Sequence, residues 1–203
     1  KEILNPIEET VIESGDLIIT SYQNVPLAEI NGFEIEYEQV FEAIMDSPND
    51  LLVKFNYTET ESEVIVNPGD TYINSIGTVV DAQNLLANGR DTRLQGQSDT
   101  IANFQIGLDN LQNQTQATLI VNYVSDRVRA RGIDVLPDII EEPPLLVDFA
   151  FSKIYSYPEY ELKLSLELRN LLDEEYYASM RNIAIYDQYD LGTSASLGFK
   201  ISF

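Results

Sequence analysis

The sequence predicts an all-β fold, an antiparallel up-and-down sheet that forms the wall of a transmembrane β-barrel. The first observation is a strict alternation of apolar and polar residues in several segments, which is the period of a β-strand. The second is that the connections between these segments are by turns short and long. The third is that aromatic residues gather near the strand ends, as in an interfacial girdle: Phe41, Tyr57, Tyr123, Tyr155, Tyr157 and Tyr160.

The clearest strand is the last one, within Leu191–Phe203. One face is apolar and the other is mostly polar, so the strand closes either a soluble sandwich or a barrel with one face against lipid. The apolar face holds Ala195, Leu197, Phe199, Ile201 and Phe203, and the other holds Ser194, Ser196, Gly198, Lys200 and Ser202.

The N-terminal part predicts two strands. Lys1–Val11 is a weak strand that Asn5-Pro6 places at an edge or near a strand end, because proline cannot donate to a ladder. A tight turn at Ser14-Gly15-Asp16 leads into a long second strand, Leu17–Phe41. Its apolar positions change from even to odd at Asn31-Gly32, which predicts a β-bulge there.

Six further strands follow, which makes about eight in all. They contain the alternating segments Val53–Thr58, Ala102–Asp109, Ala117–Tyr123, Leu145–Ser152, Leu162–Arg169 and Ser194–Phe203. The short turns are Asp46–Asp50, Asn110–Gln114 and Tyr155–Glu159, and the long loops are Asn67–Asp99, Arg131–Pro144 and Leu171–Asp190. Short turns on one side and long loops on the other are typical of outer-membrane barrels. A soluble antiparallel sandwich would explain the strands but not this asymmetry of the loops.

Charge and composition exclude several classes of function. A net charge of -22 argues against nucleic-acid binding, which needs a basic surface, and fits a solvated acidic surface. The chain has no cysteine and no histidine, so thiolate chemistry, catalytic triads with histidine and zinc sites are not expected. We therefore expect no enzyme activity, no cofactor and no metal site. No apolar run has the length of a membrane helix.

Acidic residues in the predicted loops are the remaining candidates for a cation site. Asp81, Asn84 and Asp91 lack the spacing and the closing glutamate of an EF-hand. The pairs Glu141-Glu142 and Glu174-Glu175 could bind Ca²⁺ or a cationic ligand, but solvated loop charge is the simpler interpretation.

The chain resembles the C-terminal barrel region of TonB-dependent outer-membrane receptors. The resemblance rests on short motifs in the family's order across essentially the whole chain, ending on the terminal Phe203: Asn5-Pro6-Ile7-Glu8, Tyr22-Gln23-Asn24, Gly32-Phe33-Glu34-Ile35-Glu36, Leu94-Gln95-Gly96-Gln97-Ser98 and Asn170-Leu171-Leu172-Asp173. It departs at Asp99, where the family often has proline.

The resemblance implies that residues 1–203 are the last strands of a barrel of about 22 strands. The N-terminal strands, the plug domain and the TonB box would precede Lys1, which has no leader sequence and no Met before it. It further implies a receptor in the bacterial cell outer membrane for active uptake of a scarce nutrient, such as an iron chelate, a vitamin or a saccharide. The implied partners are outer-membrane lipid, TonB through the missing N-terminal region, the outer-membrane assembly machinery and an unknown small-molecule ligand. Phe199, Ile201 and Phe203 would form the signal for assembly, although Phe203 could be only a lipid anchor.

Two alternatives remain: a self-contained structural or adhesive outer-membrane barrel of eight strands, and a soluble acidic β-sandwich that binds a partner. In the membrane interpretation one set of residues faces lipid: Phe33, Ile35, Tyr37, Phe104, Ile106, Leu119, Val121, Leu164, Leu166, Leu197 and Phe199. Their neighbours face a wet lumen: Glu34, Glu36, Gln105, Asn122, Lys163, Glu167 and Lys200. We expect an open sheet, because so many carboxylates would repel one another inside a narrow closed barrel.

Overall fold

The computed structural model describes residues 1–14, 17–44, 48–73, 78–86, 90–133, 136–181 and 183–203. The protein is all-β, and nearly all of its strand pairs are antiparallel. Within the described ranges, no helix has the length and hydropathy needed to cross a membrane.

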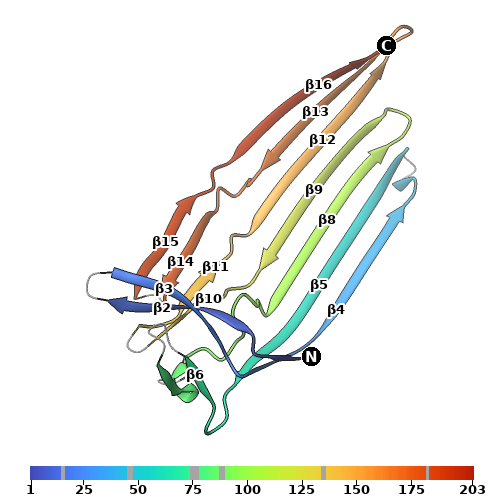
Figure 1. Cartoon of the computed structure of the whole chain (residues 1–203). Coiled ribbons are helices and arrows are strands. Elements are labelled where there is room, and N and C mark those ends of the chain that lie inside the picture. The colour runs from blue at the N-terminus through green and yellow to red at the C-terminus, as the bar shows by residue number, and fades with distance from the viewer. Residues whose placement is uncertain (15–16, 45–47, 74–77, 87–89, 134–135, 182) are drawn as a thin grey trace.

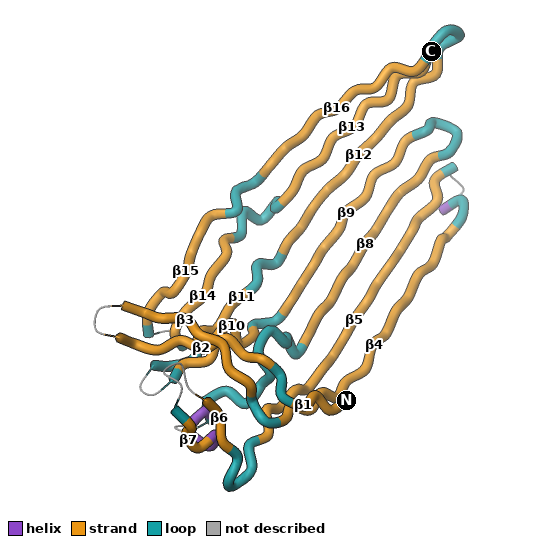
Figure 2. Tube along the Cα trace, in the orientation of Figure 1, coloured by secondary structure: helices purple, strands orange, loops and turns teal. Residues whose placement is uncertain are grey.

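The main sheet has eight strands, and its seven long strands follow chain order, as the sequence predicted. Figure 1 shows them running side by side. The order is β1 (Glu2–Leu4), β4 (Leu27–Phe41), β5 (Asn49–Ile65), β8 (Thr100–Asn110), β9 (Thr115–Val124), β12 (Leu146–Ser156), β13 (Glu161–Arg169) and β16 (Ser194–Ser202). The turns between β4 and β5, β8 and β9, and β12 and β13 lie at the same end as the C-terminus, so the predicted loop asymmetry is confirmed (Figure 2). Asp46 and Ser47 of the first turn lie outside the described residues.

The strand register confirms that the two predicted sets of side chains occupy opposite faces. Phe104 lies opposite Val121, and Leu166 lies opposite Leu197. On the other face Lys163 lies opposite Lys200. Directly opposed residues of antiparallel strands share one face of the sheet. One face is therefore apolar over most of its length, and the other is mostly polar, although Ile120 and Leu146 lie on it as well.

Among the described residues, no second sheet covers the apolar face. Leu197 is 75% exposed, Phe199 is 77% exposed and Phe33 is 55% exposed. The two buried clusters of the described chain contain none of the residues predicted to face lipid. A sandwich would bury this face, so the geometry argues against the soluble sandwich.

A six-stranded second sheet continues the main sheet beyond the long-loop end. Its order is β15 (Ala184–Asp190), β14 (Glu175–Met180), β11 (Ile139–Glu142), β10 (Arg127–Gly132), β2 (Ile7–Ser14) and β3 (Leu17–Asn24). The predictions of plain loops at Arg131–Pro144 and Leu171–Asp190 are therefore wrong. The strands within them have only four to seven residues, too few to show a clear alternation. Strand β10 does alternate in the sequence, because Arg127, Arg129 and Arg131 alternate with Val128, Ala130 and Gly132, but the sequence analysis did not use this signal.

The two N-terminal strands predicted from the sequence are each divided. Lys1–Val11 breaks into β1 and β2 at Asn5, which has a φ of 51°, and Leu17–Phe41 breaks into β3 and β4 near Pro26. Strands β2 and β3 form a hairpin that leaves the main sheet and pairs in parallel with β10. Of the predicted turn between them, Ser14 ends β2, whereas Gly15 and Asp16 lie outside the described residues.

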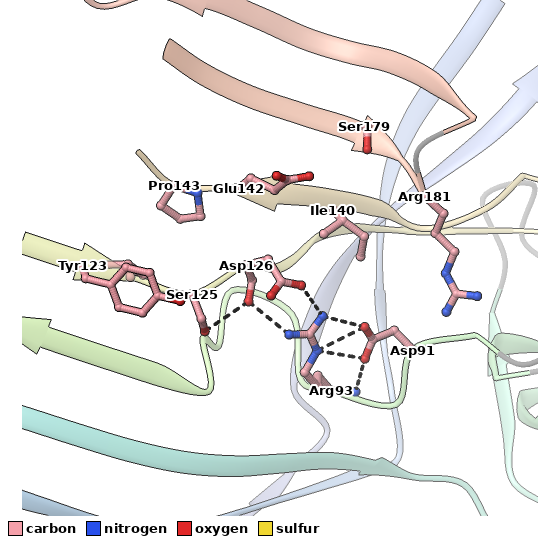
Figure 3. Close-up of a pocket in the computed structure, with 11 residues that line it drawn as sticks. Asp91, Arg93, Tyr123, Ser125, Asp126, Ile140, Glu142, Pro143, Ser179 and Arg181 are labelled. Atoms are coloured by element: carbon pink, nitrogen blue, oxygen red, sulfur yellow. Dashed lines mark hydrogen bonds and ion pairs between the residues drawn. The ribbon is translucent and has the colours of Figure 1, made fainter. Parts of the chain in front are cut away.

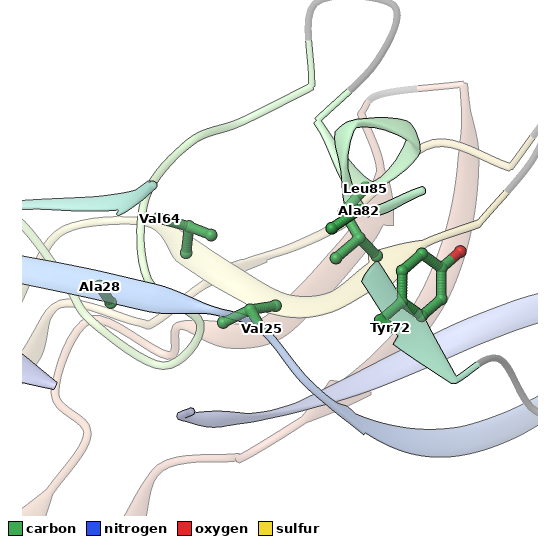
Figure 4. Close-up of a cluster of buried hydrophobic side chains, with 6 residues drawn as sticks. All are labelled: Val25, Ala28, Val64, Tyr72, Ala82 and Leu85. Atoms are coloured by element: carbon green, nitrogen blue, oxygen red, sulfur yellow. The ribbon is translucent and has the colours of Figure 1, made fainter. Parts of the chain in front are cut away.

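The predicted bulge at Asn31-Gly32 is also wrong. The register between β4 and β5 runs without a shift from Leu27 opposite Ile65 to Phe41 opposite Leu51. The apolar positions of this segment change from even to odd because Ala28, with Val64 opposite it, belongs to a buried cluster, whereas the rest of the sheet face on which these two residues lie is open. Besides Ala28 of β4 and Val64 of β5, the cluster contains residues of the link before β4, of β6 (Thr71–Ile73) and of helix η2 (Ala82–Leu85), which follows β7 (Val79–Asp81). Figure 4 shows its members: Val25, Ala28, Val64, Tyr72, Ala82 and Leu85.

The main sheet is open, as expected. Strand β1 lies at one edge and β16 lies at the other, and β16 pairs only with β13 among the described strands. Strand β1 covers only the first residues of β4, from Leu27 to Glu29. Most of β4 and all of β16 therefore present backbone donors and acceptors at a free edge.

Candidate functional site

The segment Arg90–Asp99 lies where the main sheet, the second sheet and the N-terminal hairpin meet. The amide of Val64 in β5 donates to the carbonyl of Thr92 at 2.7 Å, and the amide of Gly96 donates to the carbonyl of Val128 in β10 at 2.8 Å. The amide of Glu9 in β2 donates to Oε1 of Gln95. Gly96 has a φ of 75°, a conformation that favours glycine. Hydrogen bonds therefore join this segment to the main sheet, to the second sheet and to the N-terminal hairpin.

A buried ion pair lies beside this segment. Nε of Arg131 donates to Oε2 of Glu8 at 2.5 Å, and neither side chain is exposed to solvent. The other guanidinium nitrogens donate to the carbonyls of Asp91 and Arg93, at 2.6 and 2.9 Å. Burial lowers the pKa of Arg131, but the hydrogen bonds and charge of Glu8 outweigh burial and raise it above its usual value. Arg131 therefore remains charged and paired with Glu8.

Arg93 forms a second ionic centre at the ends of β8 and β9 (Figure 3). Its Nη2 atom lies 2.7 Å from Oδ2 of Asp91 and 3.0 Å from Oδ2 of Asp126. Nη1 donates to the carbonyl of Asp126 at 3.0 Å and lies 3.4 Å from Oδ2 of Asp99. The hydrogen bond to Asp91 raises the pKa of Arg93, and burial offsets only part of this effect. Because its donors are already used, Arg93 positions the segment rather than offering a free cation.

The pKa of Asp91 reflects the same contacts. Burial alone would raise this pKa, but hydrogen bonds from the side chain and backbone of Arg93 and the charge of Arg131 lower it below its ordinary value. Nearby Asp138 is fully buried and accepts from the amides of Gly132 and Asp91, at 3.0 and 3.1 Å. Its other neighbours are Arg90 at 3.6 Å and Arg181 at 3.7 Å.

A cavity of about 520 Å³ opens beside Arg93, between the end of β9 and strands β11 and β14. Its wall includes Asp91, Arg93, Ser125, Glu142 and Arg181. The described residues contain no group of three or more carboxylates, histidines or cysteines suited to a metal ion. The cavity can bind a polar group through hydrogen bonds.

The residues predicted from the sequence lie elsewhere. Phe199 and Ile201 project from the apolar face of β16 opposite Leu164 and Leu162, and Phe203 is fully exposed at the end of the chain. This end is remote from strands β11 and β14, which contribute to the cavity wall (Figure 1). The sequence analysis missed Glu8, Arg93 and Arg131. One available signal was the scarcity of cations. The chain has only 12 lysines and arginines against 34 aspartates and glutamates, so each cation is expected to pair with carboxylates.

The acidic pairs are not simple loop charges. Glu141 and Glu142 end β11, and Glu141 accepts from Nε of Arg127 at 2.8 Å. Glu175 begins β14 and accepts from Gln188 at 2.6 Å. The loop assignment is therefore wrong for these three residues. Their positions follow from the strands of the second sheet that the sequence did not predict.

Comparisons of the chain with models of known protein families, with curated proteins and with solved structures give no match.

Proposed function

We propose that the chain is the C-terminal wall of a TonB-dependent outer-membrane receptor, which takes up a scarce nutrient such as an iron chelate, a vitamin or a saccharide. One observation supports this most strongly. The main sheet has an exposed apolar face and a polar face, and both of its edges are free. A sheet of this kind can be stable as a barrel wall, where lipid covers the apolar face and further strands pair with the edges.

The polar face supports a wide, water-filled lumen. Across four strands Glu36, Asn56, Asn103 and Asn122 lie opposite one another in a row. Nδ2 of Asn103 donates to Oδ1 of Asn56 at 3.4 Å, and Nδ2 of Asn56 donates to Oε1 of Glu34 at 2.6 Å. Such a row of amides and carboxylates needs water or polar ligands on its open side. In this proposal nutrient passes along this face.

The two ends of the sheet support an orientation. Short turns gather at the end that holds Phe203, and the second sheet and the β6–β7 hairpin gather at the other end (Figure 2). In outer-membrane barrels the short turns face the periplasm and the longer loops face the exterior. The end that holds the second sheet and the β6–β7 hairpin, called the layered end below, would then meet the nutrient first.

The alternative of a complete eight-stranded barrel receives less support from the register. Closure would require β16 to pair with the N-terminal strand, but among the described strands β16 pairs only with β13. The interior of so small a barrel is filled by side chains. The acidic groups of the polar face would then be packed together with few cations.

Fractionation of cells that make the full-length protein tests the proposal. We expect the protein in the outer-membrane fraction, released only by detergent, and we expect deletion of its gene to abolish energy-dependent uptake of one nutrient. A strain without TonB is the matched control, because it should lose uptake while the protein remains in the membrane. Recovery of the protein in the soluble fraction without detergent would refute the proposal.

A further inference from the structure

The free edge of β4 begins where β1 ends. Strand β1 lies opposite residues 27–29 of β4. One step further, the nitrogen of Lys1 donates to the carbonyl of Ile30 at 2.7 Å, and the amide of Ile30 donates to the carbonyl of Lys1 at 2.8 Å. Residues 31–41 of β4 pair with β5 on one side and with no described strand on the other. The pairing with β1 therefore stops partway along the edge of β4.

The exposure of β4 changes at the same point. Residues 27–30 are partly or fully buried, whereas every residue from 31 to 41 is exposed. The exposed residues include three large apolar side chains, those of Phe33, Ile35 and Tyr37. A long exposed edge with unpaired backbone donors and acceptors is a template for another strand. The edge of β4 therefore has the character of an interface that β1 covers only in part.

The other free edge of the main sheet, β16, has the wrong direction to pair with β4. Each of the seven long strands is antiparallel to the next, so the first and the last both run toward the end that holds the C-terminus (Figure 1). An up-and-down barrel needs antiparallel neighbours. The strand beside β4 must therefore run the opposite way, as β1 does.

The register of β1 with β4 fixes how a longer β1 would continue. Each step from Lys1 toward the N-terminus would lie opposite one step beyond Ile30 in β4. Directly opposed residues of antiparallel strands share one face of the sheet. On the apolar face, the third, fifth and seventh residues before Lys1 would lie opposite Phe33, Ile35 and Tyr37 in that order. On the polar face, the fourth, sixth and eighth would lie opposite Glu34, Glu36 and Glu38.

The polar face of this edge lacks cations. Nζ of Lys54 lies 2.9 Å from Oε1 of Glu38, and Glu34 accepts from Nδ2 of Asn56 at 2.6 Å. Among the described residues, no hydrogen bond or ion pair reaches the carboxylate of Glu36. An opposite charge directly across from a carboxylate stabilises a strand pair, and a like charge destabilises it. The geometry therefore favours a partner strand with a cation opposite Glu36.

A second copy of the chain is a poorer partner for this edge. If the β4 edges of two copies paired with each other, one family of registers would place glutamate opposite glutamate, and like charges directly opposite are destabilising. A register shifted by one residue would place glutamates on the apolar face of the neighbouring copy. Neither arrangement satisfies both faces of β4.

We propose that about eleven residues directly before Lys1 in the full-length protein extend β1 along the rest of β4. This strand has apolar residues third, fifth and seventh before Lys1, and a lysine or arginine in sixth place, opposite Glu36. The inference rests on the proposed function, in which further strands flank the sheet, and it names the segment, the register and the charge of the strand that completes this edge.

Disulfide cross-linking of the full-length protein in its membrane tests the register. Residues 1–203 contain no cysteine, so an introduced pair has no competitor in this part of the chain. We would combine Ile35→Cys with a cysteine in fifth place before Lys1. This pair is five steps from the hydrogen-bonded pair of Lys1 and Ile30, so it is a non-hydrogen-bonded pair, whose Cα atoms lie about 4.5 Å apart and allow a disulfide. After oxidation, mass spectrometry should find the two peptides joined within one chain in most molecules.

The matched control moves the second cysteine by one residue, to sixth place before Lys1. Its side chain would then lie on the opposite face from Ile35→Cys, so no disulfide should form. A charge exchange tests the opposed pair separately. Glu36→Lys should lower the melting temperature by a few degrees, and replacing the cation in sixth place by glutamate in the same protein should restore it.

Several results would overturn the inference. They are a gene that starts at Lys1, a charged residue at one of the three apolar positions, and any residue other than lysine or arginine opposite Glu36. Equal cross-linking in the test and control proteins, or a disulfide between two copies, would overturn it as well. Fractionation decides the proposed function separately, because a cross-linked strand in a protein that needs no detergent would uphold the pairing and refute the receptor.

Discussion

Arg131 and Glu8 are separated by 123 positions in the chain and form an ion pair with both side chains fully buried. The backbone link between their strands is slight, because the parallel register of β10 and β2 contains only the pairs Arg131–Thr10 and Gly132–Val11. The ion pair and the segment Arg90–Asp99 therefore hold the N-terminal hairpin in place. A buried pair of this kind specifies which strands meet more clearly than it adds stability.

Removing one member of this pair should be strongly destabilising. Glu8→Gln leaves the buried guanidinium of Arg131 without a counter-charge, and we expect a loss of about 3–5 kcal/mol in the free energy of unfolding. Denaturant unfolding of the full-length protein in detergent, followed by circular dichroism, measures this loss. The control is Glu167→Gln, which removes an exposed pair with Arg169 at 3.2 Å and should cost less than about 1 kcal/mol. Equal effects of the two substitutions would contradict the role assigned to burial.

The sequence predicted the long strands because each has one apolar and one solvated face. Phe104 and Ile106 alternate with Gln105 and Gly107, and the register opposes them to Val121 and Leu119. The strands of the second sheet are shorter, and β11 has only four residues, too few to show a period. Strand β10 does alternate in the sequence, because Arg127, Arg129 and Arg131 alternate with Val128, Ala130 and Gly132, although Arg131 is buried as well. The sequence analysis did not use this alternation.

The ionic centres could not be predicted from the sequence, because their members lie far apart in the chain. Glu8 is followed by Glu9, yet Glu8 is fully buried whereas Glu9 is only partly buried. The two differ only in the face of β2 to which each belongs. Arg93 likewise follows Asp91 by two positions, but its further partner Asp126 comes after β9, 33 positions later in the chain. Local sequence contains no record of these long-range contacts.

The contacts of Asp91 should make the layered end sensitive to acid. The pKa of Asp91 is below its ordinary value of 3.8 in the folded protein, so the unfolded chain binds the proton more readily. Its stabilising contribution is therefore fully present above the ordinary value and is lost as the pH falls through the folded pKa. Stability of the wild type should decline below about pH 4 more steeply than that of Asp91→Asn. The same dependence of stability on pH in the two proteins would contradict this linkage. Arg93→Met should flatten the profile of stability against pH as Asp91→Asn does.

Gly32 should tolerate no side chain. A Cβ atom at this position would clash with the backbone carbonyl of Glu59 and would lie 2.8 Å from a methyl group of Thr60. Gly32→Ala must therefore move the backbone of β4 or β5, at a cost of about 1–3 kcal/mol in the free energy of unfolding. Gly107→Ala is the control, because its Cβ would meet Oγ1 of Thr118 at an ordinary 3.5 Å. A loss of stability no greater for Gly32→Ala than for Gly107→Ala would count against this close approach of the strands.

An arginine should lower the free energy of unfolding much more on the apolar face of β13 than on its polar face. In the proposed orientation Leu166 faces lipid near mid-membrane, so Leu166→Arg should destabilise the folded protein by roughly 2–4 kcal/mol. Glu167→Arg changes the neighbouring residue on the polar face, opposite Ala150 and Ser196, and should cost far less. Unfolding in lipid vesicles measures both. A small effect of Leu166→Arg would argue against lipid on this face.

Phe203 should matter for assembly rather than for the stability of the folded sheet. It follows β16, is fully exposed and lies outside both buried clusters, so its removal should leave the described packing unchanged. Phe199 and Ile201 precede it on the apolar face, which gives the assembly machinery a row of apolar side chains along a free strand edge. We expect deletion of Phe203 from the full-length protein to lower its outer-membrane level several-fold, whereas Phe203→Tyr, which keeps the aromatic ring, should insert normally. If the deletion variant reaches the wild-type level in quantified membrane fractions, Phe203 is only a lipid anchor.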